Sequence, residues 1–489
     1  MSTYLGIDLG TSATKGVIIT DSGEVLARAR ATHPESRRGL AGRADTRAWA
    51  QSLQHVIQKL GPAVAHVSGV GLDTHCPTVV PLGTDGGAVG LGVTWDSPAM
   101  RKYFEEYSGK RSAREVAATG NHASPATLTA VAYHLLRELE PDTFRAMDTM
   151  GLAGTWLGQV LTGVCALDPT QASYTGVFDT CGPGSHWLVD TCQELGIDPA
   201  VLPPVLDPIS ILGTVTSAAS ARFGIPEGLP VAVGSADTPA ASYVLGTAPG
   251  AKPFLILGTT HVVNSCLSGP DGRSLALQRR GLRDGEWLIN GVTNGGDALG
   301  AAAVFFGFGG AEDAVRDVVD LAARISPAEA ADAPYFIPHI MAERGPFWFN
   351  EPVCQLHGLN RETSRAQIAY GLVEGVVSAD RLVMEAVVPA GDESIYLTGA
   401  FGVDPVFPQL LADGTGRRFD LVMETDLPSL GAAGICAEAT AGVRLPTPTS
   451  TQTGPRADRA DLVAVRWEAW LSCWERTTGR ERIPPIEAA

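Results

Sequence analysis

The sequence predicts an α/β protein made of two similar domains. Near the amino terminus, an apolar strand ending at Asp8 is followed by the turn Gly10-Thr11-Ser12 and a second strand. The same order of strand, Gly-Thr-hydroxyl turn and strand returns about half a chain later, at Phe254–Val263. Two unrelated hairpins would give this pattern too, but its position favours a duplicated domain. Strands that alternate with helices place both halves in the α/β class.

The first half opens with three predicted strands, at Tyr4–Asp8, Thr14–Ile19 and Val25–Arg28. Asp45 can then cap a helix. Residues 67–72 form the next predicted strand. The apolar residues of the predicted helix recur at the spacing of one helical face, and they are Trp49, Leu53, Val56, Ile57 and Leu60.

A second carboxylate, Asp237, follows an apolar strand at residues 229–233 and precedes a predicted helix start. Catalytic groups of α/β proteins lie outside the carboxyl ends of strands, although an Asp here can also serve only as a helix cap. The domain boundary is predicted between residues 247 and 248. Near the end of the chain, Thr447–Pro455 predicts an exposed loop, and residues 462–474 predict a final helix.

The composition argues against several classes of partner. The net charge is −17, whereas nucleic acids and anionic membranes require clustered Lys and Arg. No apolar run reaches the roughly 18 residues of a membrane span, and the first strand leaves no room for a targeting segment. The eight cysteines show no metal-ligand spacing, so we expect reduced core residues in a cytoplasmic protein.

The first hairpin has the chemistry of a phosphate site. A turn of glycine and small hydroxyl residues exposes backbone N–H groups and short donors to phosphate oxygens. Asp8 becomes useful there if Mg²⁺ joins it to the phosphates. Taken singly, Asp8 is better explained as a turn-capping residue, and Thr11 and Ser12 as ordinary turn residues. Lys15 either faces the same cleft or is solvated.

Several motifs, in order along the whole chain, resemble those of the FGGY carbohydrate kinases, the family of xylulose, ribulose and glycerol kinases. Gly6–Gly16 resembles the first phosphate hairpin of the family, in its xylulose kinase form. The other segments that carry the resemblance are Thr119–Asn121, Asp168–Ser173, Gly234–Asp237, Gly258–Thr260, Pro338–Pro346 with Glu343 and Arg344, Leu397–Gly416 and Glu424–Ala437. Ala342 stands where the family usually has Gly.

The resemblance implies two ribonuclease-H-like (actin-like ATPase) domains around a central cleft. It also implies ATP-dependent phosphorylation of a sugar hydroxyl, D-xylulose to D-xylulose 5-phosphate first, with Asp237 as the base and Asp8 placing Mg²⁺. The phosphates would lie between Gly10, Thr11 and Ser12 on one side and Gly258, Thr259 and Thr260 on the other. A homodimer is expected from family analogy alone.

The sugar-binding motifs depart from the family pattern. The family commonly has W-x-D-x-R, where this chain has Trp95-Asp96-Ser97-Pro98 and no Arg at the usual place. Trp95 could stack on a sugar and Asp96 could accept from a hydroxyl, or both could be structural. Asp73 and His75 combine features of the ribulose and xylulose types, and we expect both to contact the sugar.

The adenosine-binding segment departs as well, since a usual G-G-G-A is replaced by Gly399-Ala400-Phe401-Gly402. Glycines at this place let a purine approach the backbone, so Phe401 could narrow that approach or stack on the ring. Gly399, Ala400 and Asp404 are the expected nucleotide contacts.

Other acceptors and other functions stay open on sequence grounds. The acceptor could be ribulose, an erythritol-like polyol or a deoxyketose. An actin-like ATPase of chaperone type would share the first hairpin, and a sugar-binding regulator would explain the altered motifs.

Overall fold

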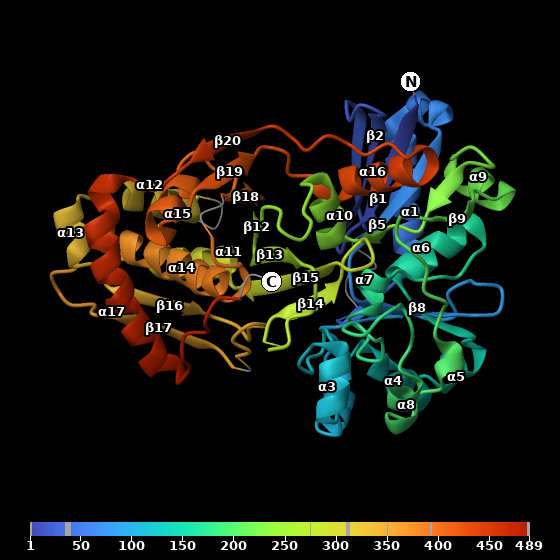
Figure 1. Ribbon diagram of the computed structural model, residues 1–489, viewed down its shortest axis with the longest axis horizontal. Coiled ribbons are helices and arrows are strands. Elements are labelled where there is room, and N and C mark those ends of the chain that lie inside the picture. Colours follow the sequence, from blue (N-terminus) through green and yellow to red (C-terminus); the bar gives the residue numbers. More distant parts are fainter. Residues whose placement is uncertain are drawn as a thin grey trace.

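A computed structural model of the chain describes residues 2–34, 41–273, 275–309, 313–349, 351–391 and 394–486 (Figure 1). Two large mixed sheets lie toward opposite ends of the molecule, each surrounded by helices. The predicted α/β class with two similar domains is confirmed. None of the described helices combines the length and the apolar character that crossing a bilayer requires.

The first sheet has the strand order β3-β2-β1-β5-β10-β9, with β11 paired to β5. Three antiparallel strands, β3, β2 and β1, are followed by β5, which runs parallel to β1, and by β10, parallel to β5. The strands span Thr3–Leu9 (β1), Ala13–Thr20 (β2), Val25–Thr32 (β3), Gly69–Thr74 (β5), Ile211–Thr214 (β9), Pro230–Ala232 (β10) and Ser235–Ala236 (β11).

The second sheet repeats this plan in the order β14-β15-β13-β12-β18-β19-β20. Strands β15, β13 and β12 are antiparallel, and β18 and β19 continue parallel to β12. The strands span Phe254–Leu257 (β12), His261–Leu267 (β13), Leu277–Arg280 (β14), Trp287–Thr293 (β15), Ile395–Thr398 (β18), Phe419–Val422 (β19) and Ser450–Thr453 (β20).

Two smaller sheets and the helices complete the described fold. The strands of the smaller sheets are Arg43–Ala44 (β4), Thr78–Leu82 (β6), Gly92–Thr94 (β7), Thr149–Leu152 (β8), Tyr335–His339 (β16) and Val353–His357 (β17). The helices are Thr46–Leu60 (α1), Met100–Ser108 (α2), Ala113–Thr119 (α3), Ala132–Leu139 (α4), Pro141–Ala146 (α5), Ala153–Thr162 (α6), Pro169–Ala172 (α7), Val189–Glu194 (α8), Ser217–Phe223 (α9), Asp237–Val244 (α10), Gly295–Phe305 (α11), Ala314–Arg324 (α12), Pro327–Ala331 (α13), Arg365–Val387 (α14), Phe407–Thr415 (α15), Leu427–Ala441 (α16) and Ala460–Thr478 (α17). Short 3₁₀ turns lie at Gly61–His66, Thr129–Val131, Pro199–Val201 and Ala457–Arg459.

Most of the predicted elements are present. The first three strands occur within a few residues of their expected bounds, and the Asp45 side chain caps α1 by accepting from the Arg47 N–H. All five apolar residues expected on one face of that helix are buried. The loop predicted at Thr447–Pro455 is wrong in its middle part, because Ser450–Thr453 is β20, an exposed strand at the edge of the second sheet. Its threonines can pair along an edge although neither side is buried.

The cysteines are only partly as predicted. The eight thiols are free, and Cys192, Cys266, Cys436 and Cys473 are buried. Cys354 is exposed, however, so the expectation that the cysteines are core residues fails for it. Its strand, β17, pairs with β16 alone, and such a two-stranded ribbon leaves side chains in solvent.

The chain returns to the first sheet after completing most of the second. Helix α16 packs on β1 and β5 and against α10, and Figure 1 shows it beside these elements. The predicted boundary at 247/248 lies in the connection between α10 and β12, so the first sheet is covered by a helix from the other side of that boundary.

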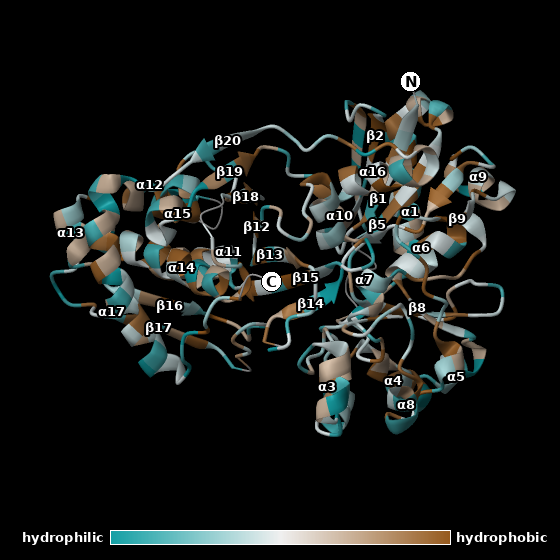
Figure 2. Ribbon diagram, viewed as in Figure 1, coloured by the Kyte–Doolittle hydropathy of each residue, from teal (hydrophilic) through white to brown (hydrophobic). Residues whose placement is uncertain are grey.

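Each sheet has its own apolar core. The larger core gathers around α14 and the second sheet, and Figure 2 shows hydrophobic residues along β13, β15 and β19. A smaller cluster joins both halves, because Tyr4 and Val17 of the first sheet pack with Phe254 and with Leu427 of α16. The two halves are therefore held together by apolar contacts beside the site described next.

Candidate active site

A row of polar side chains crosses the first sheet at the carboxyl ends of β1 and β5. Asp8 on β1 is paired in register with Lys15 on β2 and with Asp73 on β5. Asp73 is in turn paired with Ser235 on β11. Residues paired across neighbouring strands point to the same face of a sheet. The fold therefore brings the predicted metal residue Asp8 next to the predicted sugar residue Asp73.

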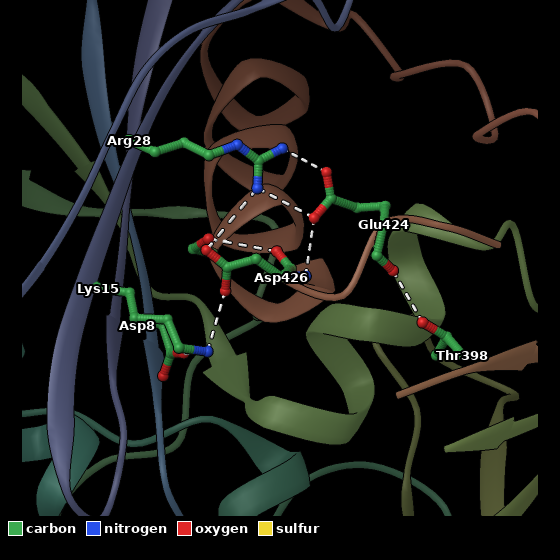
Figure 3. Close-up of polar contacts among 7 residues, drawn as sticks. Asp8, Lys15, Arg28, Thr398, Glu424 and Asp426 are labelled. Atoms are coloured by element: carbon green, nitrogen blue, oxygen red, sulfur yellow. Dashed lines mark hydrogen bonds and ion pairs between the residues drawn. The ribbon is translucent and has the colours of Figure 1, made fainter. Parts of the chain in front are cut away.

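Asp8 and Lys15 form an ion-paired cluster with Asp426, which lies just before α16 (Figure 3). Lys15 Nζ lies 3.2 Å from Asp8 Oδ2 and 3.0 Å from Asp426 Oδ1, so Lys15 is paired rather than simply solvated. Burial raises the pKa of Asp8 to about 6; Asp426 and Asp237 also raise it, and Lys15 opposes the effect.

The residues before α16 connect the two sheets. Arg28 on β3 donates to both carboxylate oxygens of Glu424, and its Nη1 lies 4.0 Å from Asp426 Oδ2 (Figure 3). The Glu424 carbonyl accepts from the hydroxyl of Thr398, at the end of β18, at 2.8 Å. Residues 424–426 are thus fixed to both halves of the chain next to Asp8.

Asp73 is completely buried, and among the described residues neither of its carboxylate oxygens has a hydrogen-bond partner. Burial, together with the charges of Asp8 and Asp237, raises the pKa of Asp73 well above its usual value. These conditions favour the protonated carboxyl, which can donate as well as accept a hydrogen bond. Asp73 is therefore equipped to bind a hydroxyl, although its contact with a sugar stays a prediction.

Asp237, the predicted base, is the first residue of α10 and is exposed. Its Oδ1 accepts from the Thr238 N–H at 2.7 Å, and no described residue bonds to its Oδ2. It lies close enough to Asp8, Asp73 and His75 to shift the pKa of each. One oxygen thus supports the helix start, and the other is free to accept a proton.

Each of the two glycine turns is closed by a backbone hydrogen bond from its glycine, although the first turn is one residue longer than the second. The Gly10 N–H donates to the Ala13 carbonyl at 3.0 Å, and the Gly258 N–H donates to the Thr260 carbonyl at 3.1 Å. Thr11 and Ser12 in the first turn, and Thr259 in the second, are exposed at the ends of their hairpins. Both turns therefore present small polar residues to solvent, as a phosphate site requires.

The predicted nucleotide segment follows β18. Gly399 has φ of 92°, and a β-carbon there would lie 2.4 Å from the Leu257 carbonyl oxygen, so that only glycine fits. Ala400 is exposed, whereas the Phe401 ring packs edge-on against the rings of His261 and Phe407.

Asp404 has a structural role in the same segment. Its Oδ1 accepts from the Val406 and Phe407 N–H groups and so supports the start of α15. The segment is therefore ordered around the end of β12, and its contact with a nucleotide stays a prediction.

The predicted sugar residues differ in how free they are. His75 Nδ1 bonds to the Leu9 carbonyl at 2.9 Å and Nε2 to the Thr78 hydroxyl at 3.1 Å, so both ring nitrogens are engaged. Burial lowers the pKa of His75. Trp95 is 36% exposed, and Asp96 is exposed and accepts from Thr94 Oγ1. Trp95 and Asp96 are open to a ligand. His75 can bind a ligand through Nε2 only after its hydrogen bond to Thr78 is broken.

Two further residues near Asp237 were not identified from the sequence as candidates for a function. Arg279, on β14, has its guanidinium 4.3 Å from the ring of Tyr174. The Arg344 guanidinium lies 5.3 Å from the ring of Trp95. Although burial opposes it, the charges of Tyr174 and Asp237 raise the pKa of Arg279, whereas burial lowers the pKa of Arg344. No motif marks Arg279, and Arg344 stood in a family signature without a role assigned to it.

The site suits a magnesium ion only together with phosphates. Within the described part of the chain, no group of three or more His, Cys, Asp or Glu residues could hold a metal alone. Mg²⁺ is commonly held by one or two carboxylates and by substrate phosphates. Asp8, with its raised pKa among Asp73 and Asp426, is a carboxylate whose charge a cation would stabilise. The residues present therefore fit the expected ion.

Comparison with known proteins identifies a family whose two domains match this chain. The N-terminal domain of the FGGY family of carbohydrate kinases matches residues 3–244, and its C-terminal domain matches residues 254–440. A xylulose kinase from Streptomyces coelicolor is 27% identical over 441 residues, which are 88% of this chain and 86% of that protein. A gluconokinase from Bacillus subtilis is 22% identical over 435 residues, covering 84% of this chain and 83% of its own.

A solved structure shows the same fold. The ligand-bound xylulose kinase from Lactobacillus acidophilus superposes with a TM-score of 0.86 at 17% identity, and the match covers 99% of each chain. At this identity the likeness concerns the arrangement of the two domains. It agrees with the two-domain architecture described above.

Proposed function

The chain belongs to the FGGY family of carbohydrate kinases, and we propose that Asp237 is the general base that activates a sugar hydroxyl in its ATP-dependent reaction. The supporting observation is the position of Asp237. Its carboxylate is exposed at the start of α10, beside the Asp8–Asp73 row. Phosphoryl transfer depends on such alignment and on charge stabilisation more than on covalent chemistry by the protein.

In this mechanism the sugar hydroxyl attacks the γ-phosphorus of ATP. The new O–P bond forms as the bond to ADP breaks, and Asp237 accepts the hydroxyl proton. The Gly10–Ser12 and Gly258–Thr260 turns would donate to the phosphate oxygens. Mg²⁺, when bound beside Asp8, would neutralise phosphate charge. Gly399, Ala400 and Asp404 would lie along the nucleoside.

The sugar would lie between Asp237 and the predicted sugar residues Asp73, His75, Trp95 and Asp96. D-xylulose is the first acceptor to test, because relatives over most of the chain are named xylulose kinases. Ribulose, an erythritol-like polyol and a deoxyketose are the further acceptors that the sequence left open.

The test is the Asp237→Asn variant in an assay of sugar-dependent ADP release over this panel. We expect turnover to fall about 10²- to 10⁴-fold, the usual contribution of a general base. Sugar binding, measured by calorimetry without nucleotide, should stay close to that of the wild type. The matched control is Asp142→Asn, which alters a carboxylate that is 93% exposed on α5.

Unchanged turnover in Asp237→Asn would remove Asp237 from the mechanism. ATP hydrolysis that needs no sugar and responds to peptides would support the actin-like ATPase instead. Sugar binding without phosphate transfer under every nucleotide tried would support a sugar-binding regulator.

The cytoplasmic location and the homodimer remain proposals. Cell fractionation of the host organism tests the location, and light scattering of the purified protein tests the oligomeric state.

A further inference from the structure

Arg279 is a buried cation without an acidic partner. Its side chain is 6% exposed, and in the described part of the chain neither Nε nor Nη1 has a hydrogen-bond partner. By contrast, the buried Arg466 donates to both carboxylate oxygens of Glu374, and Arg280 donates to two backbone carbonyls. Burying a charge is costly unless it is paired. Tyr174 and Asp237 favour the charged form of Arg279, but two of its three guanidinium nitrogens are left without a partner among the described residues.

The backbone around Arg279 is fixed by the first half of the chain. The side chain of Asn121 donates to the Gln278 carbonyl at 2.8 Å and accepts from the Gln278 N–H at 2.9 Å. The Arg280 N–H donates to Ser173 Oγ at 3.0 Å. Arg279 is thus held from both sides, so its unpaired nitrogens do not reflect a loosely placed strand.

Arg344 supplies a second cation at the same place. Its neighbour Glu343 is bound by the Asn294 N–H and the Thr293 hydroxyl, which anchors this part of the chain. The Arg344 guanidinium lies over Trp95, and no acidic side chain of the described residues forms an ion pair with it. Burial lowers the pKa of Arg344, and the charge of Arg279 lowers it further. Two neighbouring cations, neither of which forms an ion pair with an acidic side chain of the described residues, form a site for an anion.

Apart from Asp237, the arginine pair and the acidic row have different neighbours. Asp237 affects the pKa of both arginines, and it also affects those of Asp8 and Asp73. The arginines contact Tyr174 and Trp95, and Trp95 is a predicted sugar residue. Asp8, by contrast, precedes the first phosphate turn. The anion expected at the arginines therefore belongs to the sugar end of the site.

We propose that Arg279 and Arg344 bind the carboxylate of an acidic sugar, so that the preferred acceptor is an aldonate or a ketoaldonate rather than a neutral ketose. Guanidinium groups recognise carboxylates through paired, charge-assisted hydrogen bonds. The inference rests on the proposed kinase function and changes only the acceptor that the relatives suggest first.

The experiment compares matched pairs of acceptors with the full-length protein. Aldonates and 2-ketoaldonates of four to six carbons, D-gluconate among them, are each assayed beside the alditol or ketose of the same length, D-xylulose included. We expect the best acid to exceed its neutral partner and D-xylulose at least tenfold in kcat/KM. Arg279→Leu should lower kcat/KM for that acid by about 100-fold, the usual effect of losing hydrogen bonds to a charged group, and for neutral acceptors by less than about threefold.

The controls separate charge, folding and phosphate binding. Arg361→Leu removes a cation that is 92% exposed, and it should change kcat/KM neither for the acid nor for the neutral acceptors. Arg344→Leu, at a less buried position, tests the same claim if Arg279→Leu does not fold. Calorimetry of the arginine variants with D-gluconate alone and with ATP alone shows whether the arginines bind a substrate carboxylate or a phosphate. If a variant lost ATP binding but bound the acid as the wild type does, the inference would be overturned.

The two proposals fail in different ways. A neutral ketose preferred tenfold over every acid would overturn the carboxylate site and leave the kinase function standing. Absence of phosphate transfer to acids and neutral sugars alike, or unchanged turnover in Asp237→Asn, would overturn the function itself.

Discussion

Asp8 is paired with a cation and nevertheless has a raised pKa. Lys15 contacts it at 3.2 Å, yet burial and the neighbouring carboxylates raise its pKa from 3.8 to about 6. One lysine shared between Asp8 and Asp426 does not offset the removal of a carboxylate from water. A nucleotide-bound cation next to Asp8 would compensate the negative charge of its carboxylate. The ligand-free protein is therefore electrostatically strained at the residue that is proposed to place Mg²⁺.

This strain predicts a pH dependence for the ligand-free, metal-free protein. Between pH 4 and pH 6 folded Asp8 holds its proton more tightly than unfolded Asp8, so its contribution to the free energy of unfolding falls as pH rises. The raised pKa corresponds to about 3 kcal/mol. In Asp8→Asn, the part of the decrease in unfolding free energy that is due to Asp8 should be absent, as measured by urea unfolding at a series of pH values. Asp142→Asn should keep the slope of the wild type, and equal slopes for all three proteins would contradict the prediction.

At the same scale, the candidate residues that the sequence could mark stand at a strand end or in a turn. Asp8 and Asp237 are such residues, and the fold brings them close together. The proposed role of Arg279 could not be predicted, because it depends on which strand of the second half meets the first half. The full engagement of His75 depends on Thr78 and on the Leu9 carbonyl, a tertiary contact that no local pattern contains.

Helix α16 owes its close position on the first sheet to glycines in the strands. A β-carbon on Gly71 would lie 1.7 Å from the Ala432 carbonyl oxygen, and one on Gly6 would lie 2.0 Å from the Ser429 carbonyl oxygen. The backbones of helix and strands are thus in contact where most helices and sheets are separated by side chains. Asp426, immediately before this helix, depends on the contact for its position beside Asp8 and Lys15.

The substitution Gly71→Ala should therefore destabilise the protein by about 3 kcal/mol or more, because backbone must move to admit the methyl group. Thermal and urea unfolding measure the change. The control is Gly109→Ala. A β-carbon on Gly109 would meet no atom within 4 Å, and φ there is −73°, so the free energy of unfolding should change by less than about 1 kcal/mol. A stability of Gly71→Ala equal to that of the control would show that α16 is not tightly packed.

Elements with a regular pattern were predicted well, and those that depend on partners were not. The α1 helix has a cap and five apolar residues at helical spacing, all of which are local signals. Strand β20 consists of exposed polar residues and is a strand only because β19 offers an edge to pair with. The return of α16 to the first sheet is equally invisible in the sequence, since an apolar helix fits either sheet.

At the scale of the whole molecule, the two sheets repeat one plan but do not form two separate packing units. Helix α16 comes from beyond the predicted boundary at 247/248 and covers β1 and β5. Strand β14 is bound by Asn121 and Ser173 from the first half. The candidate site lies where these crossings occur. Its acidic row therefore depends on a helix from the second half, and its arginines depend on anchors from the first.

This arrangement predicts that residues 1–247 do not fold as an independent domain. Without α16, the faces of β1 and β5 that it covers would expose apolar surface and the closely packed glycines. Expressed alone, the fragment should bind the dye ANS strongly and unfold without a cooperative transition. The comparison is the same fragment joined through a flexible Gly/Ser linker to residues 424–444, which supply Glu424, Asp426 and the whole of α16.

The joined fragment should bind little ANS and unfold cooperatively, because the helix can cover the sheet and Arg28 can again pair with Glu424. A joined fragment carrying Gly71→Ala should lose this recovery, since the added methyl group blocks the seat of the helix. Cooperative unfolding of residues 1–247 alone, with no ANS binding, would mean that the first sheet is stable without α16. The Asp8 cluster would then be assembled by the association of two finished domains, and Gly71→Ala would weaken that association rather than the fold of the first domain.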